Sequence, residues 1–338
     1  MLIFPDFLKP GDVIGVTAPS DGNKKELDYI RLEHGILALK KKGYTVKETE
    51  DVRTSEKGRS SRKELRAIQL MDLYRDKRIK AIVSAKGGDF LCEILPMVDF
   101  DLIKKNPKWF QGYSDNTAFL FPVTTMLDIA TIYGNNFNDF GMEPWHKAVE
   151  QNFMILNGKL LKQESFDYYE DGFHDKVTGL ESYQNDLPVC WTNVYDKEEI
   201  VIQGRLLGGC LDVLLNLVGT RYDYVRSFID RYKQDGILWF LESFDLGSEA
   251  LIRGLWQLKE AGWFENVNGF VFGRPCMFSS YTDTTYEEAV LSILGDMQKP
   301  IIFNADIGHK NPQFTVINGA YGIIESKNGK GSLRMELR

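Results

Sequence analysis

The first half of the chain alternates short apolar runs with longer amphipathic segments, and this alternation is the feature that most constrains the fold. The run DVIGVTAPS reads as a buried strand ending in turn residues, and residues 24–43 then carry apolar side chains at close to helical spacing. The same succession recurs in YTVKE, SSRKELRAIQLMDLYRD with hydroxyl residues suited to capping, IKAIVSAKGGDF, KWFQGYS, DNTAFLFPVTTML, ATIYG, and EPWHKAVEQNFMIL with Pro144 in its first turn. Such alternation predicts an α/β fold whose parallel sheet has helices on both faces.

The pattern changes after residue 160. Residues 161–197 are polar and show no sustained period, which is typical of a linker or an ordered connecting segment. From residue 198 onward strands are more frequent than helices, and the chain ends in what we predict is an antiparallel meander. We therefore expect an N-terminal α/β domain over 1–160, a connecting segment over 161–197, and a mixed α/β domain with a β-rich end over 198–338.

Composition narrows the class of protein. The net charge of −7 over 338 residues argues against a nucleic-acid partner, because no face rich in Lys and Arg emerges from the sequence. No apolar stretch approaches the roughly 20 residues that span a bilayer, and the N-terminus lacks the basic start of a signal peptide. We expect a soluble cytoplasmic protein with no membrane partner, whose four dispersed cysteines are buried free thiols.

A serine follows the run KWFQ at the point where the next helix is expected to begin. The residues Gly112-Tyr113-Ser114-Asp115-Asn116 resemble the G-x-S-x-G turn of serine hydrolases, with Asn in the fifth position. Gly112 allows close packing behind the turn, Asn116 tolerates unusual backbone angles, and the N–H of Asp115 is placed to bind a developing oxyanion. The alternative is that Ser114 is an ordinary helix N-cap.

A second group of backbone donors is predicted in the turn Lys86-Gly87-Gly88-Asp89, which follows the run IKAIVSA. Paired glycines let the backbone approach a ligand with exposed N–H groups, although a phosphate loop or a plain tight turn would use them too. The chain has no G-x-G-x-x-G or Walker pattern and no metal-type cluster of His, Cys, Asp and Glu, so we expect no cofactor and no metal.

Only four histidines could serve as the base for a serine nucleophile, and His309 is the best placed of them. It lies in a loop directly after the strand-like run IIFNA, whereas the other three lie in helices or in the connecting segment. Glu242 ends the buried run ILWFLE and could orient the imidazole, because a carboxylate buried there needs a partner. A structural role for Glu242, in helix capping or a salt bridge, is the alternative.

With these residues identified, the chain resembles the LD-carboxypeptidase family of serine peptidases, which includes muropeptide LD-carboxypeptidases and microcin C self-immunity hydrolases. The resemblance runs over nearly the whole chain. It is carried, in order, by LKPGDVIGVTAPS, SSRKELRAIQLMDLYRDKRIKAIVSAKGGDF, GYSDNTAFL, GRLLGGCLDVL, LWFLES and DIGHKNPQFTVINGA.

The resemblance implies a catalytic triad of Ser114, Glu242 and His309, with the amides of Gly88 and Asp115 as the oxyanion hole. It also implies an N-terminal domain like class I glutamine amidotransferases, a site between the domains, and a homodimer. The glycine turn reads Lys-Gly-Gly-Asp where muropeptide carboxypeptidases of the family usually read Arg-Gly-Gly-Tyr, and the microcin-immunity branch also departs there.

The sequence leaves the substrate open. A serine carboxypeptidase or amidase could cleave a murein L,D-peptide or a microcin C-like aminoacyl-nucleotide. Contacts to the substrate are expected from Lys86, Gly87 and Asp89, with Trp191 either stacking on a nucleobase or packing its segment onto the core. Two further readings are a non-catalytic muropeptide- or nucleotide-binding protein and an α/β-hydrolase esterase. The esterase reading predicts Gly in place of Asn116 and gives the GRLLGGCLDVL region no role.

Overall fold

The computed structural model describes residues 1–196 and 198–338. The chain forms two compact units. Unit 1 consists of Met1–Leu160 and His174–Tyr183, and unit 2 consists of Leu161–Phe173 and Gln184–Arg338. The polypeptide therefore passes from one unit to the other more than once.

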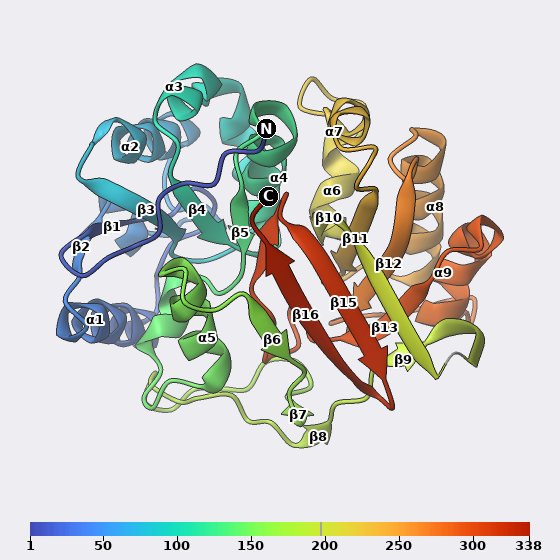
Figure 1. The fold of residues 1–338 in the computed structure, drawn as a ribbon. Coiled ribbons are helices and arrows are strands. Elements are labelled where there is room, and N and C mark those ends of the chain that lie inside the picture. Colours follow the sequence, from blue (N-terminus) through green and yellow to red (C-terminus); the bar gives the residue numbers. More distant parts are fainter. Residues whose placement is uncertain (197) are drawn as a thin grey trace. The chain divides into compact units, whose positions relative to one another are not determined.

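Unit 1 is built on a parallel sheet in the order β5-β4-β3-β1-β2. The strands of this sheet are β1 (Val13–Thr17), β2 (Thr45–Glu48), β3 (Ile79–Ser84), β4 (Trp109–Gly112) and β5 (Thr131–Tyr133). Figure 1 shows α2, α3 and α4 on one side of this sheet and α1 and α5 on the other. The bounds of these helices are α1 (Glu26–Lys41), α2 (Lys63–Arg75), α3 (Phe100–Lys105), α4 (Thr117–Leu127) and α5 (Lys147–Leu156). The parallel α/β fold predicted for this part of the chain is confirmed.

Unit 2 contains a mixed sheet in the order β6-β16-β15-β10-β11-β12-β13-β9. Its central strands β10 to β13 are parallel, and β15 pairs antiparallel with both β10 and β16, as the predicted meander requires. The strands of this sheet are β6 (Lys162–Glu164), β9 (Thr192–Asn193), β10 (Glu199–Cys210), β11 (Ile237–Glu242), β12 (Val267–Gly273), β13 (Ile301–Ala305), β15 (Tyr321–Lys327) and β16 (Lys330–Glu336). A short strand that is not part of this sheet, β14 (Val316–Asn318), precedes β15. The helices are α6 (Leu211–Leu217), α7 (Val225–Arg231), α8 (Ser248–Glu260) and α9 (Tyr286–Leu294).

Residues 161–196 contain short strands of two or three residues. Strands β6 and β9 are the edges of the unit 2 sheet, and β7 (Tyr168–Tyr169) pairs with β8 (Leu187–Pro188). Strands this short carry no readable period, because a period of two needs several repeats before it can be recognised.

Several local expectations were wrong. Pro144 precedes α5 and forms a cis peptide bond with Glu143, and the N-cap is His146, whose Nδ1 accepts from the Ala148 N–H at 3.1 Å. The hydroxyl residues before α2 do not cap it, since its N-cap Arg62 makes no side-chain capping bond. None of the four cysteines, all of them among the described residues, forms a disulfide, but Cys92 and Cys190 are exposed and not buried as expected.

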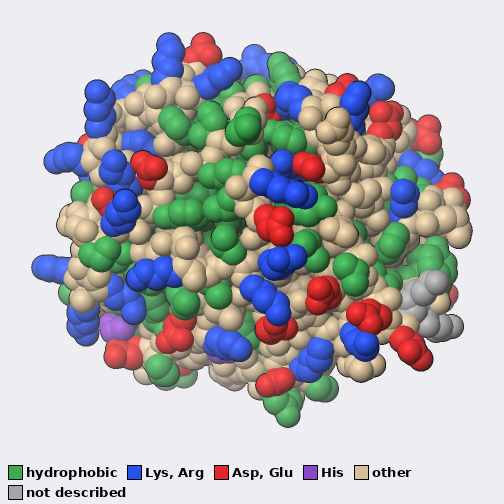
Figure 2. Space-filling model, in the orientation of Figure 1, with side chains coloured by type: hydrophobic (Ala, Val, Ile, Leu, Met, Phe, Trp, Pro, Cys, Tyr) green, Lys and Arg blue, Asp and Glu red, His purple; other side chains and the backbone are tan. Residues whose placement is uncertain are grey.

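The molecular surface carries both signs of charge. Figure 2 shows Lys and Arg side chains interspersed with Asp and Glu on the face that it displays. Within the part of the chain that the structure describes, no helix combines the length and apolar character needed to cross a membrane.

Candidate active site

Ser114 lies in the turn between β4 and α4, where a short 3₁₀ helix, η3 (Ser114–Asn116), leads into α4. Its φ is +64°, a conformation that L-residues other than Asn and Asp rarely adopt. Its backbone N–H donates to the Tyr133 hydroxyl at 3.3 Å. Holding a residue in such a conformation lowers the stability of the folded protein by about 1–3 kcal/mol, and strained residues of this kind cluster at active sites. The backbone at Ser114 therefore has the geometry of a nucleophile elbow and not that of an ordinary N-cap, which takes extended angles.

Asn116 braces this turn through its side chain. The backbone of Asn116 is ordinary right-handed helix, with φ of −60°, so the unusual backbone angles expected of it occur at Ser114 instead. Its Nδ2 donates to the carbonyl oxygens of Lys86 at 3.1 Å and Tyr113 at 3.0 Å. A Cβ on Gly112 would lie 2.8 Å from Asn116 Cγ, so Gly112 leaves the space that Asn116 occupies. The Asn therefore ties the serine turn to the glycine turn.

The glycine turn after β3 lies directly against the serine. A Cβ on Gly87 would be 3.0 Å from Ser114 Cβ and 3.1 Å from its Oγ. Gly88 has a φ of +147°, and a Cβ there would be 2.3 Å from Ser20 Oγ. Gly88 therefore requires glycine, and a side chain at Gly87 would crowd Ser114. Asp89 is exposed at the end of the turn, and the Lys86 Nζ lies 3.4 Å from the Asp28 carboxylate.

The Asp115 side chain is an anchor for the turn. Its buried carboxylate accepts from Ser20 Oγ at 2.5 Å and from the Leu91 N–H at 2.8 Å. Burial raises the pKa of Asp115, and these hydrogen bonds oppose that rise. Sequence reasoning did not identify Ser20, although its place at the end of the first strand was a signal.

Glu242 and His309 form a buried pair within unit 2. Glu242 is the last residue of β11, and its Oε2 lies 2.8 Å from His309 Nδ1. Gly308 has a φ of +96°, and a Cβ there would lie 2.5 Å from Glu242 Oε2. The glycine before the histidine thus lets the loop pass close to the carboxylate. The His309 ring also packs against Phe244, with ring centroids 4.8 Å apart.

A second buried ion pair supports the loop that carries His309. Arg274 Nη1 lies 2.8 Å from Asp306 Oδ1, and both side chains are buried. Arg274 Nη2 donates to the Lys310 carbonyl at 3.0 Å. The arginine therefore holds the loop on both sides of the histidine. It was missed in the sequence, although its position immediately after the run GFVFG was the available signal.

Trp191 is a packing residue in unit 2. It is only 3% exposed, and its indole N–H donates to Asp306 Oδ2 at 3.1 Å. Its ring packs against Phe314 and leaves no room for a Cβ on Gly331. Of the two roles considered for Trp191, these contacts support packing over stacking on a nucleobase.

The three histidines that were not favoured as the catalytic base have ordinary surroundings. His34 pairs with Glu143 at 2.6 Å, His146 caps α5 and His174 is exposed. Among the described residues, no group of three or more His, Cys, Asp and Glu side chains could hold a metal ion.

The chain as a whole is similar to several known proteins. The solved structure of the MccF-like protein from Bacillus anthracis has a TM-score of 0.81 and 26% identity, covering 99% of this chain and 100% of that one. The "Probable murein peptide carboxypeptidase" of Bacillus subtilis is 27% identical, with coverage of 98% and 97%. The "Microcin C7 self-immunity protein MccF" of Escherichia coli is 24% identical, with coverage of 95% and 92%.

Two family models match the chain in the order of its sequence. Residues 14–134 match the LD-carboxypeptidase N-terminal domain, and residues 203–324 match the LD-carboxypeptidase C-terminal domain. Together the two matches cover well over half of the chain, and they confirm the resemblance predicted from its motifs. The chain belongs to the LD-carboxypeptidase family of serine peptidases.

Proposed function

We propose that the protein is a cofactor-independent serine carboxypeptidase or amidase in which Ser114 attacks a substrate amide. The observation that carries this proposal is the backbone of Ser114, held at a φ of +64° with Gly87 packed against its side chain. A strained serine at a strand-to-helix turn keeps its hydroxyl exposed to a carbonyl carbon, which an N-cap serine does not do.

The proposed base is His309, oriented by Glu242. Because Glu242 Oε2 lies 2.8 Å from Nδ1, the other ring nitrogen, Nε2, is assigned to take the Ser114 proton. Nε2 then returns this proton to the leaving amine, and the carboxylate stabilises the imidazolium between the two steps. Water, deprotonated by the same nitrogen, hydrolyses the resulting acyl-enzyme.

The amides of Gly88 and Asp115 are the proposed oxyanion donors. The side-chain contacts of Asp115 with Ser20 and Leu91 fix the orientation of its peptide, and the φ of +147° at Gly88 sets that of the other amide. Donors fixed before the reaction stabilise a tetrahedral oxyanion without reorganising, which is the largest single contribution in many hydrolases.

Two substrate classes follow from the relatives. One relative is named for murein peptides. The solved structures of MccF resemble this chain in fold. MccF was solved with aspartyl sulfamoyl adenosine and with glutamyl sulfamoyl guanosine. The proposed substrate is therefore either an L,D-peptide bond of a murein fragment or the amide of an aminoacyl-nucleotide.

The test is turnover of both substrate classes by the wild type and by Ser114→Ala, His309→Ala and Glu242→Gln, followed by mass spectrometry. Release of a terminal D-Ala or of the amino acid by the wild type, reduced at least about a thousandfold in Ser114→Ala, is the expected result. Ser292→Ala, a change of the same type on α9, is the control and should turn over substrate like the wild type. Comparable turnover by Ser114→Ala would refute the nucleophile assignment, and binding without turnover by the wild type would favour a non-catalytic binding protein.

A further inference from the structure

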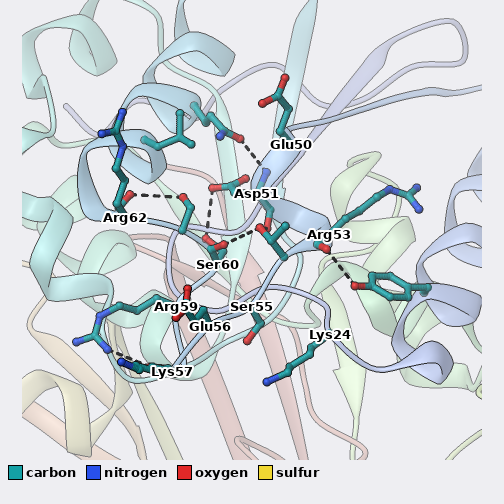
Figure 3. Close-up of a pocket in the computed structure, with 15 residues that line it drawn as sticks. Lys24, Glu50, Asp51, Arg53, Ser55, Glu56, Lys57, Arg59, Ser60 and Arg62 are labelled. Atoms are coloured by element: carbon teal, nitrogen blue, oxygen red, sulfur yellow. Dashed lines mark hydrogen bonds between the residues drawn. The ribbon is translucent and has the colours of Figure 1, made fainter.

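A cavity of about 900 Å³ lies in unit 1 outside the catalytic residues. Its lining comes from the loop after β1 and the start of α1, from η1 (Glu50–Arg53) after β2, from the segment that leads into α2, and from α2 itself. Figure 3 shows the lining side chains, among them Lys24 from the first loop and Lys57, Arg59 and Arg62 from the last segment.

The cavity lies at the same edge of the sheet as Ser114. All five strands of the unit 1 sheet are parallel, so the loops after β4, β3, β1 and β2 emerge at one edge in that spatial order. Hydrogen bonds connect these loops, from the Asp21 N–H to the Gly87 carbonyl at 3.2 Å and from the Ser60 N–H to the Ser20 carbonyl at 2.9 Å. Three strand spacings separate β4 from β2, which amounts to about 14 Å.

Three basic side chains in the lining are not engaged in an ion pair with any described residue. Five basic side chains (Lys24, Arg53, Lys57, Arg59 and Arg62) and three acidic ones (Glu50, Asp51 and Glu56) line the cavity of a chain with a net charge of −7. Arg53 and Arg59 are paired with glutamates outside the lining, at 2.6–2.8 Å. Among the described residues no carboxylate lies within salt-bridge distance of Lys24, Lys57 or Arg62.

Uncharged donors also lie in the lining. Gln69 is only 8% exposed, its Oε1 accepts from the Asp51 N–H at 3.1 Å, and its Nε2 has no hydrogen-bond partner among the described residues. The first turn of α2, with Arg62 and Leu65 in the lining, has no side-chain cap. A buried donor without an acceptor is costly, and an anion bound nearby would provide one.

We propose that this cavity is a subsite for a distal carboxylate of a peptide substrate, about four residues from the bond that Ser114 cleaves. An extended peptide spans 3.3–3.6 Å per residue, so four residues bridge about 14 Å. A carboxypeptidase removes one terminal residue, so the remaining residues belong to the acyl part and extend away from the leaving group. This inference rests on the proposed function. It favours an acidic peptide as the substrate over an aminoacyl-nucleotide, because the charged linkage of an aminoacyl-nucleotide lies next to the scissile amide and not four residues away.

The experiment measures binding in the full-length Ser114→Ala variant by calorimetry. Two acetylated pentapeptides, Ac-Glu-Ala-Ala-Lys-D-Ala and Ac-Gln-Ala-Ala-Lys-D-Ala, differ only in the carboxylate four residues before the L,D-bond. We expect the acidic peptide to bind about tenfold more tightly, as a few partly exposed ionic contacts would allow. The additional changes Lys24→Gln, Lys57→Gln and Arg62→Gln should abolish this preference. The matched control removes three exposed charges elsewhere in unit 1, with Lys40→Gln, Lys104→Gln and Lys105→Gln, and should retain it.

Equal affinities for the two peptides, no binding of either, or a preference that survives in the cavity variant would overturn the proposal. A loss of affinity for aspartyl sulfamoyl adenosine in the cavity variant would contradict it as well, because that ligand carries no distal carboxylate four residues away. Turnover of the same peptides by the wild type tests the catalytic proposal separately, since the binding measurement does not require it.

Discussion

A comparison of two glycines with positive φ distinguishes the cost of an unfavourable backbone conformation from the cost of a close contact at the candidate site. Gly308 has a φ of +96° and Gly219 a φ of +72°, so both conformations are unfavourable for an alanine. A Cβ on Gly308 would meet Glu242 Oε2 at 2.5 Å, whereas nothing lies within 4 Å of a Cβ on Gly219. Only the first glycine is therefore tied to the pairing of Glu242 with His309.

We predict that Gly308→Ala lowers kcat at least tenfold and costs more stability than the roughly 1–2 kcal/mol of the backbone conformation alone. Gly219→Ala should show only that backbone cost and keep full activity. Urea denaturation and steady-state kinetics of the two variants make the comparison. Equal effects of the two substitutions would mean that the contact with Glu242 has no role.

The raised pKa of the buried Asp51 carboxyl group leads to a predicted pH dependence of the free energy of unfolding. Burial raises its pKa from 3.8 to about 6. A carboxyl group whose pKa is raised binds its proton more tightly in the folded state, so the protein loses stability as the pH rises from about 4 to above 6. A rise of the pKa from 3.8 to about 6 corresponds to about 3 kcal/mol.

Asp51→Asn should therefore be more stable than the wild type at pH 8, by up to about 3 kcal/mol, and this advantage should vanish near pH 4. Denaturation at several pH values checks it. Asp76→Asn is the control, because hydrogen bonds from Arg78 lower the pKa of Asp76 and its loss should bring no gain at pH 8. A wild type as stable at pH 8 as at pH 5 would count against the raised pKa.

At the scale of elements, the sequence predicted the regular strands and helices well and their ends less well. Strand β11 is an uninterrupted apolar run up to Glu242, β3 is apolar apart from Lys80 and Ser84, and helices such as α8 keep a helical period, so hydrophobic spacing identifies these elements. The start of α5 after Pro144 and the missing cap of α2 depend on local backbone geometry. Hydrophobic periodicity carries no information about such local geometry.

The candidate site likewise contains residues that can be predicted from the sequence and residues that cannot. Ser114, Gly87, Glu242 and His309 stand at the ends of apolar runs, where a functional side chain can be predicted from position. The pairing of Arg274 with Asp306 joins residues 32 positions apart in the chain and has no local pattern that would reveal it.

We predict that Arg274→Met destabilises the protein by about 3–5 kcal/mol, because it leaves Asp306 buried without its cation. Burial already raises the pKa of Asp306 and Arg274 opposes that rise, so its removal raises the pKa further. The loss of stability should therefore be greater at pH 8 than at pH 5. Arg78→Met, which breaks an exposed pair with Asp76, should cost less than about 1 kcal/mol. A loss independent of pH would show that packing alone accounts for the effect.

At the scale of the whole molecule, the chain returns to unit 1 over His174–Tyr183 after it has entered unit 2. The buried Arg31 holds this return segment through hydrogen bonds to the carbonyls of Gly179 at 2.9 Å and Glu181 at 3.0 Å. Lys176, within the segment, is exposed.

Arg31→Met should release this segment and raise the rate of tryptic cleavage after Lys176 several-fold, because proteolysis follows the population of locally opened chain. Mass spectrometry of timed digests measures it. Arg75→Met, which removes an exposed arginine of α2, should leave the rate unchanged. An unchanged rate in Arg31→Met would mean that other contacts hold the segment.

The return of the chain to unit 1 has a consequence for recombining members of this family. A chimera joined once at residue 160 would take residues 174–183 from the same parent as unit 2, although these residues fold with unit 1. Arg31 would then face carbonyls from a foreign loop, and Asn135 would meet a foreign partner in place of the Tyr183 hydroxyl, which lies 2.9 Å from it. Grafting one unit onto another parent therefore requires three junctions, after residues 160, 173 and 183.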